Sequence, residues 1–291
     1  MTQSSFKTKD GTRLVYTDSE TGFPLLALAG FTRSRRDFDY MARHLPDVRL
    51  IRLDSRGRGE SDWTGADSYT AIQEAQDALE LLDHLGLERV AIIGTSRGGL
   101  LGMLMAMSAP QRVAGLCLND VGPALERAGL ERIGKYIGVE PAVSTLEEIA
   151  SRMPAVMPGF DNVPELRWEQ ETTRRYTLTS KGIALPYDPD LAKSFQKALA
   201  SPVTDAWPLF DACACMPLAL IRGANSDVLS CATADRMQAC RPDMIRVDIP
   251  DRGHTPFLDE PEALKAIQLW LERCTCKQAD SLQPAKALVG A

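Results

Sequence analysis

One serine lies in a motif that could make it a nucleophile. The stretch RVAIIGTSRGGLLGMLMA, residues 89–106, contains Gly-x-Ser-x-Gly with Ser96 between Gly94 and Gly98. An apolar, strand-like run precedes the motif and a helix-like run follows it. A sharp strand-to-helix turn exposes the serine hydroxyl, and the glycines let the two elements approach closely. We therefore predict that Ser96 is a nucleophile; the alternative is a glycine-rich turn with an idle serine.

A serine hydroxyl is a poor nucleophile unless a nearby base removes its proton. The chain has three histidines. His44 and His84 lie near the ends of helix-like segments, and neither follows a strand. His254 lies in DIPDRGHTPFLDEPEAL, in the loop between the last predicted strand and the last predicted helix. A glycine precedes it and gives the loop room to turn the ring inward, so we predict that His254 is the general base.

The third group needed is a carboxylate that orients the imidazole and stabilises it when protonated. Asp227 follows the penultimate predicted strand, and it gives the chain order Ser, Asp, His that accompanies this motif. Asp120 is the alternative, because it ends the predicted strand VAGLCLND after the nucleophile's helix. Asp54 ends an earlier strand but belongs to a turn-like stretch. We favour Asp227, which leaves Asp120 as a structural carboxylate at the start of the next segment.

Strand-like and helix-like segments alternate around these residues. Continuous apolar strands that are connected by helices indicate a mostly parallel sheet covered on both faces. A proline-rich stretch with helix-like pieces interrupts this alternation after the sixth strand. We predict a core of residues 1–121 and 212–273, a helical lid of residues 122–211 and a loose tail of residues 274–291. The strands are expected at 24–29, 48–54, 89–94, 113–120, 216–223 and 244–250, after a hairpin around Asp10–Gly11.

Five short motifs together resemble the α/β-hydrolase superfamily, in its lidded serine esterase, lactonase and C–C hydrolase branch. They are AGF (29–31), DSRGRGESD (54–62), GTSRGG (94–99), GANSDV (223–228) and DRGHTPFLDEPE (251–262). The resemblance covers about residues 6–273 and implies the α/β-hydrolase fold. It also implies an oxyanion hole formed by the backbone N–H groups of Phe31 and Arg97. Many relatives carry His-Gly where this chain has Ala29-Gly30, so a side chain that often braces this loop is missing.

The chemistry implied is acyl transfer to water through an acyl-enzyme intermediate. Serine at position 96 argues against the dehalogenase and epoxide hydrolase branches, which need a carboxylate there. We expect a hydrolase of carboxylic esters or lactones of small to medium apolar substrates. A C–C bond hydrolase of diketone-type ring-cleavage products and a ligand-binding protein with little turnover are the alternatives. The residues expected to contact substrate are Phe31, Arg97, Trp168 and Met157.

The composition limits the classes of molecule that the protein is expected to bind. The 291 residues carry a formal net charge of −6 with interspersed signs, and no basic stripe suggests nucleic acid. No apolar run approaches the roughly 18 residues of a membrane span, and no signal peptide is apparent. The seven scattered cysteines lack zinc-site spacing and indicate free thiols in the cytoplasm. We expect a cytoplasmic protein that acts on a small molecule with no metal or organic cofactor. A homo-oligomer is compatible with the sequence.

Overall fold

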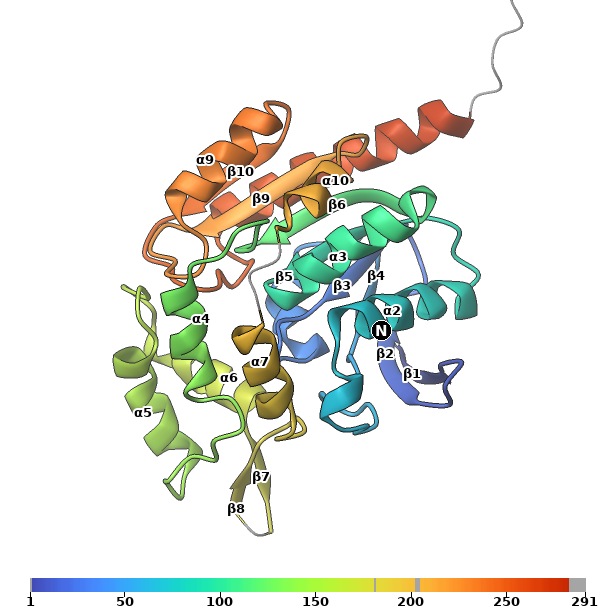
Figure 1. The fold of residues 1–291 in the computed structure, drawn as a ribbon. Coiled ribbons are helices and arrows are strands. Elements are labelled where there is room, and N and C mark those ends of the chain that lie inside the picture. Colours follow the sequence, from blue (N-terminus) through green and yellow to red (C-terminus); the bar gives the residue numbers. More distant parts are fainter. Residues whose placement is uncertain (1, 181, 202–204, 283–291) are drawn as a thin grey trace, which may run out of the picture.

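An eight-stranded sheet forms the centre of the computed structural model, which describes residues 2–180, 182–201 and 205–282 (Figure 1). The strand order is β1-β2-β4-β3-β5-β6-β9-β10, and only the β1–β2 and β2–β4 pairs are antiparallel. The strands are β1 (Thr2–Lys7), β2 (Arg13–Asp18), β3 (Phe23–Leu28), β4 (Val48–Leu53), β5 (Val90–Thr95), β6 (Val113–Asn119), β9 (Leu218–Gly223) and β10 (Ile245–Ile249). The predicted α/β fold class with a mostly parallel sheet is confirmed.

Helices cover both faces of this sheet. The helices of the core are α1 (Asp39–Ala42), α2 (Ala71–His84), α3 (Arg97–Ser108), α8 (Trp207–Asp211), α9 (Cys231–Cys240) and α10 (Pro261–Leu282). Side chains of α2, α3, α8 and α9 share one apolar cluster with the sheet, and side chains of α1 and α10 share the other. In the described part of the chain, no helix combines the length and apolar character needed to cross a bilayer.

The central strands carry the site because their carboxyl ends meet at one edge. Every residue of β5, β6 and β9 is buried, as their continuous apolar sequences predict. Thr95 at the end of β5 pairs with Asn119 at the end of β6, and Asn119 pairs with Ile221 of β9. The residues that follow these three strands therefore lie side by side.

Most of the segment between β6 and β9 gathers beyond this edge of the sheet (Figure 1), while its last helix, α8, packs with the core. We keep the name lid segment for residues 122–211. It contains α4 (Arg127–Gly134), α5 (Leu146–Val156), α6 (Glu165–Arg175), α7 (Leu191–Ala200) and a hairpin of β7 (Thr177–Thr179) and β8 (Gly182–Ala184). Two details differ from expectation. Phe210 of α8 is buried in the main core, and α10 continues helically to Leu282 where a loose tail was expected; residues 283–291 lie outside the described part.

The turn between β5 and α3 is as tight as the motif predicts. Ser96 has φ 50° and ψ −113°, a left-handed backbone that is costly for a residue with a side chain. A Cβ atom on Gly98 would lie 1.9 Å from the carbonyl oxygen of Leu28, and one on Gly94 would lie 2.4 Å from the backbone of Gly98. Only glycine lets α3 begin this close to the sheet.

Substituting Gly98 by alanine should therefore destabilise the protein by at least about 3 kcal/mol, because backbone atoms cannot yield as a side chain can. Gly134→Ala is the matched control, since its Cβ would meet only side-chain atoms, at 3.3 Å. The control should change stability by less than about 1 kcal/mol. Chemical denaturation of both variants provides the measurement, and equal effects would contradict the close-approach explanation.

Candidate active site

Three side chains form a continuous hydrogen-bonded chain at the carboxyl edge of the sheet. His254 Nε2 lies 2.9 Å from Ser96 Oγ, and His254 Nδ1 lies 2.7 Å from Asp120 Oδ2. The imidazole side chain is only 8% exposed, and the carboxylate is fully buried. A carboxylate on Nδ1 fixes the proton there and leaves Nε2 free to accept the serine proton. The structure thus brings together the two residues that the motifs predict and an acid.

The carboxylate beside His254 is that of Asp120 and not that of Asp227, the residue favoured from the sequence. Asp227 turns away and accepts two hydrogen bonds from Arg132 of α4, at 2.6 and 2.9 Å. The GANSDV loop instead contributes Ser226, whose hydroxyl donates to Asp120 Oδ2 at 2.6 Å. The amide of Gly223 donates to the other carboxylate oxygen at 2.8 Å.

A pocket opens over Ser96 and His254. Its cavity volume is about 90 Å³. That is well below a typical ligand site of about 300–1,000 Å³. The pocket is lined by both apolar and charged residues. The apolar lining residues are Phe31, Tyr40, Ile133, Tyr136, Ile137, Pro256, Phe257 and Leu258, and the charged ones are Arg33, Asp37, Glu171 and Arg175.

Phe31 and Arg97 meet only part of what was expected of them. Phe31 lines the pocket, and its ring packs against Phe195 of α7 with the ring centroids 5.2 Å apart. The Arg97 side chain lies outside the pocket lining and donates to Glu74 of α2 at 2.9 Å. Its substrate contact is therefore not supported. Neither backbone N–H of these two residues has an acceptor among the described residues, so both can donate to a ligand.

Trp168 and Met157 do not line the pocket, contrary to expectation. Trp168 is 4% exposed and packs in an apolar cluster with Phe160 of the lid segment and Phe257 of the core. Met157 packs against the same cluster. These side chains fix the lid segment onto the core, because burying their apolar surface there stabilises that contact.

Arg58 braces the loop that carries Phe31. Its Nε donates to the carbonyl oxygen of Phe31 at 2.7 Å, and its guanidinium lies 5.0 Å from the Phe31 ring centroid. Glu74 accepts from Arg58 at 2.9 Å and from Arg97 on its other oxygen. Burial would raise the pKa of Glu74, but the two guanidinium charges hold it below its ordinary value.

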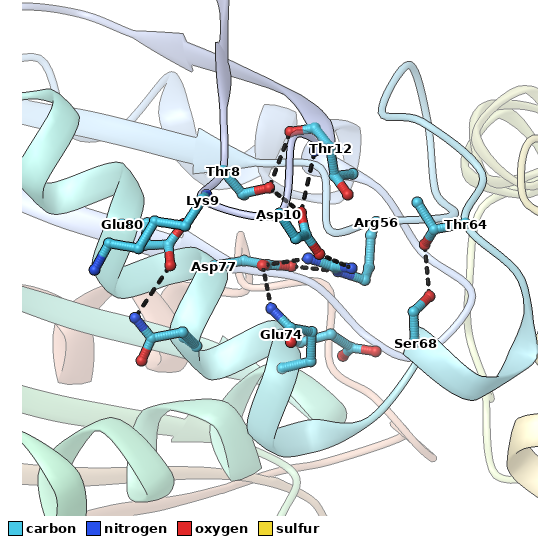
Figure 2. A network of polar contacts seen from close by, with 12 residues as sticks. Thr8, Lys9, Asp10, Thr12, Arg56, Thr64, Ser68, Glu74, Asp77 and Glu80 are labelled. Carbon is cyan, nitrogen blue, oxygen red and sulfur yellow. Dashed lines mark hydrogen bonds and ion pairs between the residues drawn. The ribbon is translucent and has the colours of Figure 1, made fainter.

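Arg56, two residues before Arg58, anchors the same loop. Arg56 donates to both oxygens of Asp77 at 2.6 Å and to Asp10 at 3.0 Å, which joins this loop to α2 and to the turn after β1 (Figure 2). The side chains of Arg56 and Asp77 are almost fully buried. The stretch 54–62 is thus a structural network, as the sequence suggested for Asp54, and it reaches the pocket through Arg58.

Several residues of this site were not predicted from the sequence. Arg33 and Asp37 follow Phe31 closely in the sequence. Their closeness to the predicted oxyanion loop could therefore have identified them as residues of the site. Glu171 and Arg58 offered no such signal, because a charged residue in a helix or loop is usually solvated. Within the described ranges, no group of three or more His, Cys, Asp or Glu side chains is arranged to hold a metal ion.

The Arg58–Glu74 pair gives a stability prediction. Both side chains are 1% exposed, so Arg58→Met should leave a buried carboxylate with one cation and cost about 3–5 kcal/mol. Arg13→Met is the control, because the Arg13–Asp62 pair is more than two-fifths exposed and should contribute under about 1 kcal/mol. Urea denaturation measures both. A loss under 1 kcal/mol for Arg58→Met would contradict the assigned role.

Comparison with known proteins agrees with this architecture. The sequence model of the alpha/beta hydrolase family matches residues 25–267. The 3-hydroxybutyrate-oligomer hydrolase of Cupriavidus necator is 35% identical over 247 residues, which are 81% of this chain and 84% of that protein. A crystal structure of an alpha/beta hydrolase from Novosphingobium aromaticivorans superposes with a TM-score of 0.88 and 40% identity over 94% of this chain and 98% of that one. A thermophilic esterase from Thermogutta terrifontis, 24% identical with a TM-score of 0.72 over 94% and 99% of the two chains, shares the fold. The chain therefore belongs to the alpha/beta hydrolase family.

Proposed function

We propose that this hydrolase is a serine esterase that cleaves a carboxylic ester or lactone through an acyl-enzyme intermediate. The observation that carries the proposal is the hydrogen-bonded chain from Ser96 through His254 to the buried Asp120. Its distances match those of a nucleophile, a general base and an orienting acid. The strained backbone at Ser96 supports the same role, since such strain concentrates at functional sites.

The reaction follows from these contacts. Ser96 Oγ attacks the carbonyl carbon while His254 Nε2 takes the hydroxyl proton, and the Asp120 carboxylate stabilises the resulting imidazolium. The backbone N–H groups of Phe31 and Arg97 donate to the oxyanion, and the amino end of α3 adds its positive dipole. His254 then passes the proton to the departing alkoxide oxygen, which releases the alcohol. A water molecule gives a proton to His254 and attacks the acyl-serine. The acid then leaves as His254 returns that proton to Ser96 Oγ.

The pocket favours a short acyl group. Its volume of about 90 Å³ is small for a ligand site, and the side chains of Phe31, Ile133 and Ile137 offer the acyl group an apolar wall. The relative from Cupriavidus necator supports ester chemistry, because its name gives an oligomer of a hydroxy acid as substrate and such oligomers are joined by ester bonds. A C–C bond hydrolase would use the same three side chains on a diketone-type substrate.

Short p-nitrophenyl esters test the proposal. The wild-type protein should release p-nitrophenol in a burst followed by steady turnover, and Ser96→Ala should lose at least about 10³-fold in kcat. Vinylogous diketones belong in the same screen. Turnover of these alone would move the assignment to C–C cleavage, and a stoichiometric burst without turnover would indicate a ligand-binding protein.

The two aspartates provide a second test. Asp120→Asn should lower kcat by about 10³–10⁴-fold, because the amide favours the wrong imidazole tautomer. Asp227→Asn loses only an ion pair that is about one-third exposed, so it should keep kcat within about threefold. The two variants are matched in size and charge change. A larger loss of kcat in Asp227→Asn than in Asp120→Asn would instead identify Asp227 as the orienting acid.

A further inference from the structure

The charged wall of the reaction pocket has one unsatisfied donor. Arg33 Nε and Nη2 donate to the two oxygens of Asp37 at 2.6 and 2.7 Å, and Nη2 also donates to Glu171 at 3.1 Å. Nη1 is buried and has no hydrogen-bond partner among the described residues. A buried guanidinium edge without an acceptor is costly, so a ligand oxygen that accepts from it would gain binding free energy.

Arg33 is fixed in place beside the reaction centre. It lies two residues after Phe31, and its backbone N–H donates to the carbonyl of Gly30 at 3.0 Å. A Cβ on Gly30 would lie 3.2 Å from Arg33 Cγ, so the arginine stem covers the loop that carries the Phe31 amide. Burial alone would lower the pKa of Arg33, but the charges of Asp37 and Glu171 raise it well above its ordinary value. The cation is permanent and its side chain is only 13% exposed.

The charges that line the pocket already balance. Arg33 and Arg175 are matched by Asp37 and Glu171, and Arg175 Nη2 donates to Glu171 at 3.1 Å. A substrate carboxylate would therefore add an unpaired charge to a largely buried wall, which is unfavourable. A neutral oxygen satisfies Arg33 Nη1 without that penalty.

A second unpaired polar atom lines the same pocket. Asn119 Nδ2 donates to Thr95 Oγ1 at 3.1 Å and to the carbonyl of Pro256 at 3.2 Å. Because a carbonyl can only accept, this contact fixes the amide orientation and leaves Asn119 Oδ1 as a buried acceptor without a donor among the described residues. The hydroxyl of Tyr40, another lining residue, is likewise buried without a partner in the described part of the chain. The pocket lining thus combines free donor and acceptor groups, which suit a hydroxyl-bearing ligand.

We propose that Arg33 is a specificity-determining residue that selects acyl chains bearing a neutral oxygen, in the form of a hydroxyl group, over plain alkanoyl chains and over chains ending in a carboxylate. This inference rests on the proposed esterase function. It names the substrate class as short hydroxyacyl esters.

Three ethyl esters of matched size test the inference: ethyl butyrate, ethyl 3-hydroxybutyrate and monoethyl succinate. The wild-type kcat/KM should be about tenfold higher for the hydroxy ester than for the plain ester, as expected for one hydrogen bond to a charged group. It should be lowest for the succinate monoester. Arg33→Lys keeps a cation for Asp37 and Glu171 but removes the free edge, so the hydroxy-to-plain ratio should fall to about one.

Arg174→Lys is the matched control. This neighbouring arginine does not line the pocket and donates to the backbone carbonyls of Arg36 and Gln170, so the ratio should stay at its wild-type value. Because each variant is scored by a ratio of two esters, a general loss of folded protein does not affect the result. A wild-type ratio of one, or a ratio that survives in Arg33→Lys, overturns the inference and leaves the esterase proposal intact. If none of the three esters is hydrolysed, the result counts against the proposed esterase function itself.

Discussion

The site depends on one buried carboxylate and on the three groups that donate hydrogen bonds to it. Asp120 takes hydrogen bonds from the amide of Gly223, the hydroxyl of Ser226 and the ring of His254. These donors come from the end of β9 and from the loops after β9 and β10, whereas Asp120 directly follows β6. A fully buried charge is tolerated only when such partners surround it. The same contacts that make the charge tolerable also bring distant parts of the chain to the edge of the sheet beside Ser96.

The sequence predicted the frame and the two most distinctive side chains, for physical reasons. Apolar runs marked the buried strands, and the glycines around Ser96 marked a close approach that no other residue allows. His254 stood out because the chain has few histidines. The acid could not be decided in this way, because both Asp120 and Asp227 follow strands. The deciding fact is register: Asn119 pairs with Thr95, so the next residue lies beside Ser96.

The lid segment shows a further limit of sequence reasoning. An apolar residue there can face either the substrate or the core, and periodicity does not distinguish the two. Trp168 packs inward, while the pocket is lined by charged residues such as Glu171 that a sequence would place in solvent. Such charged residues can be recognised as part of the pocket only when their partners are known. Glu171, for example, is buried because guanidinium groups from the core loop and from its own helix surround it.

The Arg132–Asp227 pair has a consequence beyond the identity of the acid. It fastens α4, which carries Ile133 of the pocket wall, to the loop that holds Ser226. The two side chains are 28% and 36% exposed, so dissolved ions reach them and weaken their attraction. A backbone hydrogen bond of 2.9 Å from Glu126 to Val228 joins the same two segments, so salt should weaken this link without removing it. The ion pair therefore helps to position this part of the pocket wall, whereas the hydrogen bonds of Asp120 involve other groups.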